Sequence, residues 1–289
     1  MTVHGTTEPE LDISEVTSYA EGLDHPEGVT VTAEGVVYAG GEAGQVYRID
    51  NGTASQVAST GGFLLGLCAD ASGVLYCCDV ARREVVRVDP STHDVAVYSA
   101  GTDDRPMVNP NWPVFDPAGN LYVTDSGTWN GDDGCVFRVR PDGVTEIWST
   151  ACTGFPNGAC LSTDGRTLFV LESQTPALVA ITIDDSGAAG GRRVIADLPN
   201  TVPDGVTLAA DGAMLVCCYR PDRILRVRPD GVVTVVADDP LGTTLSAPTN
   251  GVWVGANLDV LVTGNLGRWH LSQLKPGGTG VPLHYPEMP

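Results

Sequence analysis

Hydrophobic and polar residues recur along the chain in six related segments. Each segment begins at a residue that we call the anchor of its repeat, and the anchors are Glu27, Leu65, Asn111, Asn157, Asp204 and Asn250. By subtraction, successive anchors are 38, 46, 46, 47 and 46 residues apart. Apolar side chains alternate at the second and fourth positions after an anchor, as in Val29 and Val31, and this period of two predicts a β-strand.

A tight hairpin is expected after each of these strands. A glycine stands eight residues after the anchor in five repeats, and Leu258 takes its place in the sixth. Eleven residues after the anchor, every repeat has an apolar or aromatic side chain, which predicts a second strand. A third strand is expected over stretches such as 45–50, 84–89, 136–140 and 224–228, and a short fourth strand over stretches such as 232–237.

Four strands in a repeat of about 40 to 50 residues is the size of a propeller blade. The pattern therefore predicts an all-β fold, a six-bladed β-propeller with four-stranded blades, formed by a single domain over residues 1–289. The last repeat has only three strands, whereas a spare strand-like segment stands at 14–19, before the first anchor. We expect this N-terminal strand to pair with the third strand of the last blade, because closure removes exposed sheet edges.

The anchors are candidates for a metal site at one end of the central channel. Five of the six carry a side-chain oxygen, and Glu27 and Asp204 are carboxylates. Oxygen ligands suit hard divalent ions, so Ca²⁺ is the expected cofactor, with Mg²⁺, Mn²⁺ or, less favoured, Zn²⁺ as alternatives. Asn-Gly and Asp-Gly pairs are also common turns. The recurrence of polar anchors before otherwise apolar strands favours the metal.

A family resemblance rests on these same positions. The segments Pro26-Glu27-Gly28, Pro156-Asn157-Gly158 and Pro203-Asp204-Gly205, at these spacings, resemble the senescence-marker-protein/gluconolactonase/luciferin-regenerating-enzyme-like family, which includes regucalcin-type lactonases. This family is similar to diisopropyl fluorophosphatase, and the resemblance covers about residues 15–275. It implies that Glu27, Asn157 and Asp204 are metal ligands, and that Asn111 contacts the metal or its water and substrate.

One departure concerns specificity. Sugar-lactonase relatives carry an arginine two residues before the Asn111 position, whereas this chain has Asn109 there, with Arg105 in the same loop. Sugar lactones are therefore not implied as substrates.

Further residues are expected around the site. The loops 102–110 and 126–134, with Met107, Trp129 and Asn130, are expected to form a lid or wall. The remaining candidates for substrate contact are Asn109, Asn250, Arg105, Leu65, Trp112 and Phe155, besides Asn111. His25, beside Glu27, is either a base or a packing residue, and packing is favoured for His270. Asp125 and Glu172 end second strands and either bind substrate or solvate the rim.

Charge and composition limit the classes of partner that the protein is expected to bind. The net charge of −20 disfavours nucleic acids and anionic membranes, which leaves a small-molecule substrate, and the oligomeric state stays open. Neither an apolar signal-peptide core within residues 1–20 nor a stretch of about 18 apolar residues is present. The eight cysteines include two adjacent pairs and no CxxC spacing, so we expect reduced, buried thiols in a cytoplasmic protein.

The sequence thus predicts a divalent-metal-dependent hydrolase of a lactone or related ester. The metal would polarise the carbonyl, while Asp204 would both hold the metal and activate water. Alternatives are an organophosphate hydrolase, an isomerase or lyase acting at an activated carbonyl on the same metal site, and a non-catalytic, metal-stabilised binding propeller. The chain has no Gly-x-Ser-x-Gly elbow and no Walker or dinucleotide fingerprint.

Overall fold

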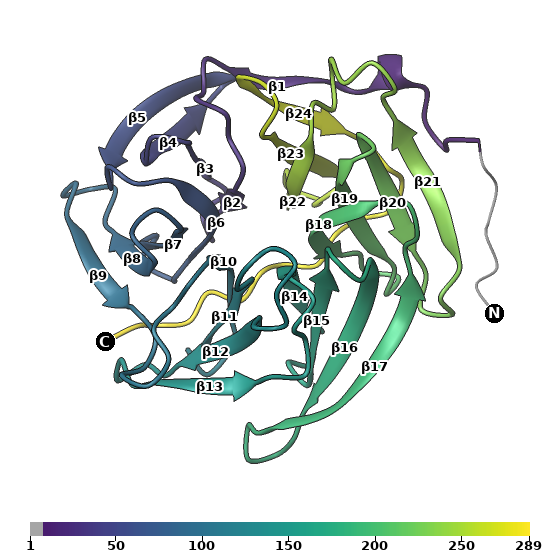
Figure 1. Ribbon diagram of the computed structural model, residues 1–289. Helices are drawn as coiled ribbons and strands as arrows, with labels where there is room; N and C mark the ends of the chain where they lie inside the picture. The colour runs from purple at the N-terminus through teal and green to yellow at the C-terminus, as the bar shows by residue number, and fades with distance from the viewer. Residues whose placement is uncertain (1–7) are drawn as a thin grey trace.

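The computed structural model describes residues 8–289, and this part of the chain is built almost entirely of β-strands. It contains strands β1 to β24 and one short 3-10 helix, η1 (Ile13–Glu15). The sheets stand around a common centre in a propeller-like arrangement (Figure 1). The all-β prediction is confirmed.

Four of the six repeats form separate antiparallel sheets of four strands in chain order. The second repeat contains β6 (Leu64–Ala69), β7 (Leu75–Asp79), β8 (Glu84–Val88) and β9 (Val95–Ser99). The third contains β10 (Pro110–Phe115), β11 (Leu121–Asp125), β12 (Cys135–Val139) and β13 (Thr145–Ser149). The fourth contains β14 (Pro156–Leu161), β15 (Thr167–Glu172), β16 (Ala177–Ile183) and β17 (Ala189–Asp197). The fifth contains β18 (Val202–Leu208), β19 (Met214–Arg220), β20 (Arg223–Val227) and β21 (Val233–Asp238).

The first and sixth repeats share one sheet of eight strands, whereas the sequence predicted six separate blades. The first repeat contributes β2 (Val29–Val31), β3 (Val37–Gly40), β4 (Gln45–Asp50) and β5 (Thr53–Ser59). The sixth contributes β22 (Pro248–Val254), β23 (Val260–Asn265) and β24 (His270–Leu274). Strand β1 (Thr17–Glu21) lies between the two halves. It pairs antiparallel with β24, and it meets β5 through the single parallel pair Glu21 and Thr53.

The N-terminal strand pairs with the strand that the sequence predicted as its partner. It pairs with the third strand of the last repeat, from Thr17 opposite Gln273 to Glu21 opposite His270. Its position along the chain is shifted, because the first two residues of the predicted strand, Ser14 and Glu15, belong to η1, where Asp12 and Glu15 make a capping box.

The hydrophobic core is divided into six clusters, and each is shared by two neighbouring repeats. One cluster joins the sixth repeat to the first, and it contains Val29 and Val31 beside Val252 and Val254. The hairpin glycines also behave as predicted. Gly35, Gly73, Gly119, Gly165 and Gly212 have positive φ, a conformation that glycine adopts without steric cost, and Leu258 has a φ of 50° in the sixth repeat.

The C-terminal segment 276–289 crosses the end of the channel opposite the anchors, a feature that the sequence analysis did not predict (Figure 1). Gly280 forms a β-bridge with Ala209, and the Tyr285 hydroxyl donates to the carbonyl oxygen of Val31 at 2.9 Å. Residues of this segment close a small cavity of about 60 Å³ that is lined by the inner strands. The channel is therefore covered at this end by the chain itself.

All eight cysteines are free and buried, and burial raises the pKa of each thiol. They are therefore protonated packing residues at neutral pH.

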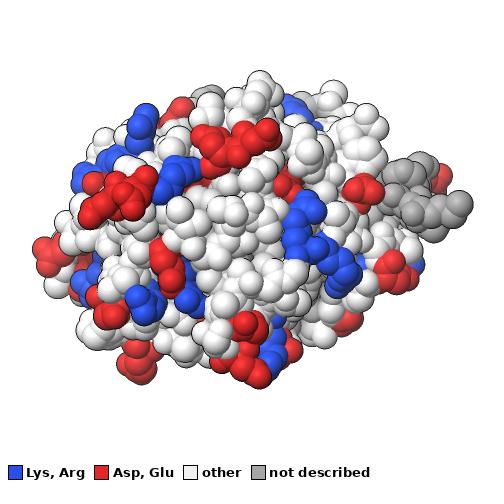
Figure 2. All heavy atoms as spheres, turned by 60° about the horizontal axis from the view of Figure 1, so that its bottom comes forward, with Lys and Arg blue, Asp and Glu red and all other residues white. Residues whose placement is uncertain are grey.

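Within residues 8–289, no helix has the length and apolar character that crossing a bilayer requires. On the face drawn in Figure 2, acidic side chains form several groups and basic side chains lie among them.

We predict that deletion of residues 1–21 lowers the midpoint of thermal unfolding by about 10 °C or more, because it removes β1 and exposes the edge of β24. Replacing the exposed side chains of Thr17 and Glu21 by alanine, which preserves the backbone pairing, should change the midpoint little. Differential scanning calorimetry of both variants tests this. An unchanged midpoint in the deletion variant would show that β1 does not hold the last repeat.

Candidate metal centre

The anchors lie at the beginning of the innermost strands. Strands β6, β10, β14, β18 and β22 contain the later five anchors, and Glu27 stands two residues before β2. The glycines that follow the anchors all lie within the described residues, and none of them has a positive φ. The interpretation of the Asn-Gly and Asp-Gly pairs as ordinary turns is therefore wrong for this chain.

These glycines instead let neighbouring repeats approach closely. A Cβ atom on Gly205 would lie 2.2 Å from Asn250 Oδ1 and 2.4 Å from the carbonyl oxygen of Thr249. A Cβ atom on Gly28 would lie 2.1 Å from the carbonyl oxygen of Leu65. A side chain at these positions would push the inner strands apart, so the glycines allow the anchors to converge.

Strand pairing is irregular at the anchors, which changes the direction of their side chains. In five repeats the register shifts around the anchor, between Leu64 and Leu67, Pro110 and Trp112, Pro156 and Ala159, Pro203 and Val206, and Pro248 and Gly251. A shift of this kind re-aims a side chain relative to the regular alternation of the sheet. The anchors thus leave the alternating pattern of the strands that they begin.

Hydroxyl side chains, which the sequence analysis missed, hold the backbone of the anchors. Thr124 donates to the carbonyl oxygen of Asn157 at 2.7 Å, and Thr249 donates to that of Glu27 at 2.7 Å. The Ser173 hydroxyl accepts a hydrogen bond from Asn157 Nδ2 at 3.2 Å, which orients the amide. The only signal in the sequence is a small hydroxyl residue near the end of a second strand or beside an anchor, and this is too common to be specific.

The anchor oxygens are buried without hydrogen-bond partners. The five polar anchors are only 1% to 7% exposed. Among the described residues, ten buried side-chain nitrogen or oxygen atoms have no partner, and four of these are oxygens of Asn111, Asn157, Asp204 and Asn250. A fifth is Asn109 Oδ1. Each such oxygen costs about 1 to 3 kcal/mol unless something else satisfies it.

The two carboxylates of the ring lie close enough to influence each other. Burial raises the pKa of Glu27 well above its usual range, and the nearby charge of Asp204 raises it further. Burial likewise raises the pKa of Asp204 well above its usual range. Two ionised carboxylates are unfavourable in such a site unless a cation neutralises them.

The residues present fit a hard divalent cation. Two carboxylates match a charge of +2, and the unpartnered amide oxygens of Asn111 and Asn157 add neutral donors. A thiolate site does not fit, because the pKa values of the cysteines are raised. The four residues expected as ligands, Glu27, Asn111, Asn157 and Asp204, are all buried, and three of them have an unpartnered oxygen. Asn250, expected as a substrate contact, also has one.

The expected apolar wall residues have different positions. Leu65 is 6% exposed and occupies the anchor position of the second repeat. Trp112 lies along the inner wall of the cavity that the C-terminal segment closes. Trp129 and Phe155 pack edge to face with ring centroids 4.8 Å apart. Met107, expected in the lid or wall, is instead buried in the core between the second and third repeats, because the loop turns its side chain inward.

Arg105 and Asn109 belong to one loop that is tied to the protein. The Arg105 guanidinium donates to the carbonyl oxygens of Pro106 and Asp133, at 2.8 Å and 2.6 Å. The backbone amide of Asn109 donates to Asp125 at 3.2 Å, while Asn109 Oδ1 has no partner. Arg105 therefore connects two loops, and Asn109 has a buried amide oxygen without a partner.

Asp125 and Glu172, which end second strands, serve the loops rather than solvent. Asp125 is fully buried and accepts hydrogen bonds from the backbone amides of Val108 and Gly127. Glu172 is 3% exposed, accepts from the amide of Gly154 and forms an ion pair with Arg192. The expectation that they solvate the rim is wrong, because both carboxylates are buried and have hydrogen-bond or ion-pair partners inside the protein.

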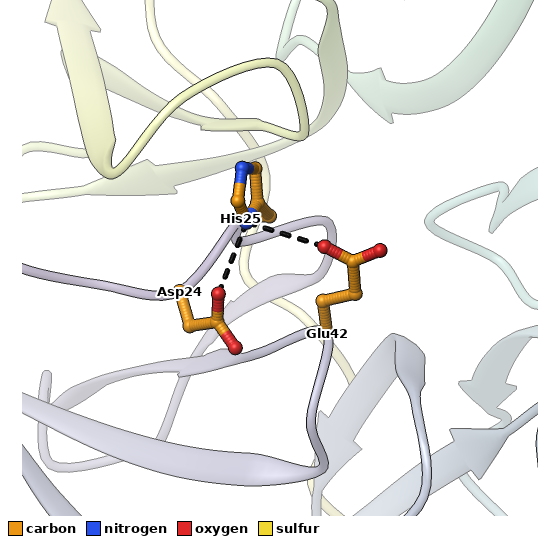
Figure 3. A group of neighbouring side chains, drawn as sticks. All are labelled: Asp24, His25 and Glu42. Carbon is orange, nitrogen blue, oxygen red and sulfur yellow. Dashed lines mark hydrogen bonds and ion pairs between the residues drawn. The ribbon is translucent and has the colours of Figure 1, made fainter.

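A second cluster of ligand-type groups lies beside the ring. Asp24, His25 and Glu42 offer ligand atoms that all lie within 4.8 Å of one another (Figure 3). His25 Nδ1 lies 3.0 Å from Asp24 Oδ1 and 3.2 Å from Glu42 Oε2. These groups satisfy one another, whereas the anchor oxygens have no partners, so the anchors are the stronger candidate for a cation site.

His270 has a packing role, as the sequence favoured. Its Nε2 atom lies 3.0 Å from the carbonyl oxygen of Thr244, and strand β24 carries it on the outer part of the last repeat.

Comparisons with known proteins agree with this architecture. A sequence model of the SMP-30/Gluconolactonase/LRE-like region matches residues 26–263. The chain is 25% identical over 186 residues to a gluconolactonase of Zymomonas mobilis, which covers 57% of this chain and 51% of that protein. It is 32% identical over 122 residues to lactonase drp35 of Staphylococcus haemolyticus, over 39% of this chain and 36% of that protein. The chain thus spans about half the length, or less, of these curated relatives.

Solved structures share the fold. A gluconolactonase from Xanthomonas campestris superposes with a TM-score of 0.76 at 20% identity, covering 89% of this chain and 88% of that one. A calcium-binding protein, regucalcin, from Agrobacterium tumefaciens superposes with a TM-score of 0.73 at 17% identity, covering 92% and 97%.

We predict that removing divalent cations destabilises the protein, and more so as the pH rises. The raised pKa values mean that the folded chain keeps protons on Glu27 and Asp204 above about pH 4, where the unfolded chain has lost them. The free energy of unfolding of the chelated protein should therefore fall with rising pH, and added cation should restore it. Denaturant titrations with EDTA or with Ca²⁺ at several pH values measure both effects.

The variant Glu27→Gln complements this chelation experiment, because it removes one buried charge and leaves the size of the side chain unchanged. It should weaken cation binding in calorimetric titration by about tenfold or more, yet make the chelated protein more stable than chelated wild type near neutral pH. Equal stability of the two chelated proteins, together with equal cation affinity, would contradict a cation site at the anchors.

We also predict that Gly205→Ala disrupts the convergence of the anchors. Its Cβ atom would meet Asn250 Oδ1 and the Thr249 carbonyl oxygen, and the cost is about 3 kcal/mol of unfolding free energy. The control is Gly191→Ala, where a Cβ atom has no neighbour within 4 Å. Urea unfolding compares the two variants, and equal stability would mean that close approach at Gly205 is not required.

Proposed function

Because the chain belongs to the SMP-30/gluconolactonase/LRE-like family, whose sequence model covers residues 26–263, we propose that it is a divalent-metal-dependent hydrolase of a lactone or related ester. The relatives named gluconolactonase and lactonase drp35 support a lactone as the small-molecule substrate. The observation that carries the proposal is the set of buried, unpartnered oxygens on Asn111, Asn157 and Asp204 beside the buried carboxylate of Glu27.

The scaffold that we propose is one domain over residues 1–289, a closed ring of six four-stranded blades. In this description the eight-stranded sheet counts as two blades, because its halves are joined only through the pair Glu21 and Thr53. The core cluster shared by the first and sixth repeats supports closure, since it resembles the clusters between the other neighbours. The N-terminal strand β1 then serves as the fourth strand of the last blade.

We propose Ca²⁺ as the resident ion, with Mg²⁺, Mn²⁺ and Zn²⁺ as alternatives. Oxygen-only donors and a mixture of carboxylates and amides favour Ca²⁺ over zinc. The structural relative described as a calcium-binding regucalcin supports the same choice. Free, buried cysteines support a reducing, cytoplasmic location.

The residues of the chain have distinct parts in the proposed reaction. Glu27, Asn157 and Asp204 would hold the cation, which would supply Lewis-acid polarisation of the substrate carbonyl. Asn111, whose amide oxygen has no protein partner, orients the substrate and the nucleophilic water, while Asn157 fixes the geometry by holding the cation. Ser173 holds the Asn157 amide in place, so its direction is set before the substrate arrives.

Asp204 is the proposed general base. Its carboxylate is 7% exposed, and one oxygen has no hydrogen-bond partner, so it is free to accept a proton. Asp204 takes a proton from water as the water oxygen bonds to the acyl carbon, and the proton then goes to the ring oxygen as the acyl–oxygen bond breaks. The product is a hydroxy acid, and no further reactant is needed.

The function is tested by assaying a panel of lactones, aryl esters and phosphotriesters with EDTA and with added Ca²⁺. We expect cation-dependent hydrolysis of a lactone. Turnover confined to phosphotriesters, or binding without turnover, would replace the proposal by the phosphoesterase or the binding-propeller alternative.

The roles of the residues are tested with Asp204→Asn, Asn111→Ala and Glu27→Gln at saturating cation. Asp204→Asn keeps an oxygen donor but removes the base, so kcat should fall about 100-fold or more. Asn111→Ala should mainly raise KM, and excess cation should restore part of the activity of Glu27→Gln. Wild-type kcat in the Asp204 variant would show that the base lies elsewhere, with His25 the next candidate.

A further inference from the structure

Two of the anchors are preceded by an aromatic side chain in an unusual backbone conformation. His25 and Phe155 each stand two residues before an anchor and immediately before a proline, with φ of 42° and 62°. Positive φ is rare for residues other than glycine, and it persists only where the surroundings enforce it. The two side chains therefore have fixed positions next to Glu27 and Asn157.

Each of these aromatic side chains packs against an exposed tryptophan of the preceding repeat. Phe155 meets Trp129 with ring centroids 4.8 Å apart at 75°, and His25 meets Trp269 at 5.5 Å and 62°. Both tryptophans come from the loop between the second and third strands of their repeats. Trp129 is 50% exposed and Trp269 is 57% exposed, although tryptophan is usually well buried.

The loops that carry the tryptophans are tied to the anchor segments. A Cβ atom on Gly134 would lie 2.3 Å from Pro156 Cδ, so the loop of Trp129 touches the proline before Asn157. The carbonyl oxygen of Trp269 accepts hydrogen bonds from the amides of Gly22 and Leu23, at 3.0 Å and 3.1 Å. Both loops are therefore tied to segments that lead into an anchor.

The two pairs belong to the first and fourth of the six repeats, which are opposite positions in a six-membered ring. The other four repeats have no such pair: the residues two positions before their anchors are Phe63, Asn109, Val202 and Pro248. Only Phe63 is aromatic among these, and it packs against the core between the second and third repeats. The two tryptophans thus pack against residues that precede the anchors of opposite repeats, at the end of the channel where the anchors lie, which we call the mouth.

Several charged groups of the loops around the site are engaged with protein partners. Arg105 binds two backbone carbonyl oxygens, and Asp133 accepts from Thr128 at 2.7 Å. Asp24 accepts from Gln45 and lies beside His25, which also faces Glu42 (Figure 3). Beside these engaged charges, the exposed faces of Trp129 and Trp269 offer a surface on which an apolar substituent can pack.

We propose that Trp129 and Trp269, supported by Phe155 and His25, form a substrate clamp at the mouth. The inference rests on the proposed lactonase function and specifies its substrate class, a neutral lactone that carries an apolar alkyl or aryl substituent rather than a sugar lactone. The exposed faces of the two tryptophans bury this substituent while the ring carbonyl reaches the anchors.

The test compares δ-decalactone, whose ring carries a pentyl chain, with glucono-δ-lactone. Wild type should have the higher kcat/KM for δ-decalactone. Trp129→Ala and Trp269→Ala should each lower this value about tenfold, mainly through KM, while Trp129→Phe should retain most of it. The control is Ile147→Ala, which truncates a side chain that is 43% exposed on the outer strand β13 and should change nothing. Preference for glucono-δ-lactone, or unchanged KM in both alanine variants, would overturn the clamp.

A binding measurement separates failure of the clamp from failure of the proposed function. The corresponding pentyl-substituted δ-lactam has an amide in place of the ester, and its binding is measured by calorimetry at saturating Ca²⁺ whether or not any lactone is hydrolysed. Binding to wild type that weakens about tenfold in both alanine variants supports the clamp even if the chain is not a lactonase. Absence of binding to wild type, or equal binding to all variants, overturns it.

Discussion

Several side-chain oxygens are buried at one end of the channel, where they have left water without gaining protein partners. Asn111, Asn157, Asp204 and Asn250 each have such an oxygen, and the pKa values of Glu27 and Asp204 are raised by burial. An interior arranged in this way is unfavourable on its own, because every orphaned acceptor and every buried charge reduces stability. A divalent cation bound at the centre would offset both costs, and the glycines after the anchors leave room for the oxygens to approach one another.

The rest of the inner ring maintains that convergence. Glycines after the anchors allow neighbouring strands to approach, and hydroxyl groups such as Thr124 and Thr249 hold the anchor carbonyl groups. The N-terminal strand completes the last repeat, and the C-terminal segment covers the far end of the channel. The covered far end supports the proposal that ligands enter past Trp129 and Trp269, which are exposed.

The repeats and anchors could be predicted from the sequence because their causes are local. Period-two alternation, hairpin glycines and the distance between anchors are properties of short segments, and Gly35 and its equivalents have the predicted positive φ. The pairing of β1 with β5, the C-terminal segment and the Ser173 contact depend on residues far apart in the chain, so no local pattern indicates them. Asp125 illustrates the same limit: its position at the end of a strand was clear, but not the backbone amides that it binds.

The central claim, that the anchors hold one divalent cation, is tested most directly by anomalous diffraction from crystals grown with Mn²⁺. The account predicts one strong anomalous peak within coordination distance of oxygens from Glu27, Asn157 and Asp204. Absence of a peak there, or a peak only between Asp24, His25 and Glu42, would contradict it.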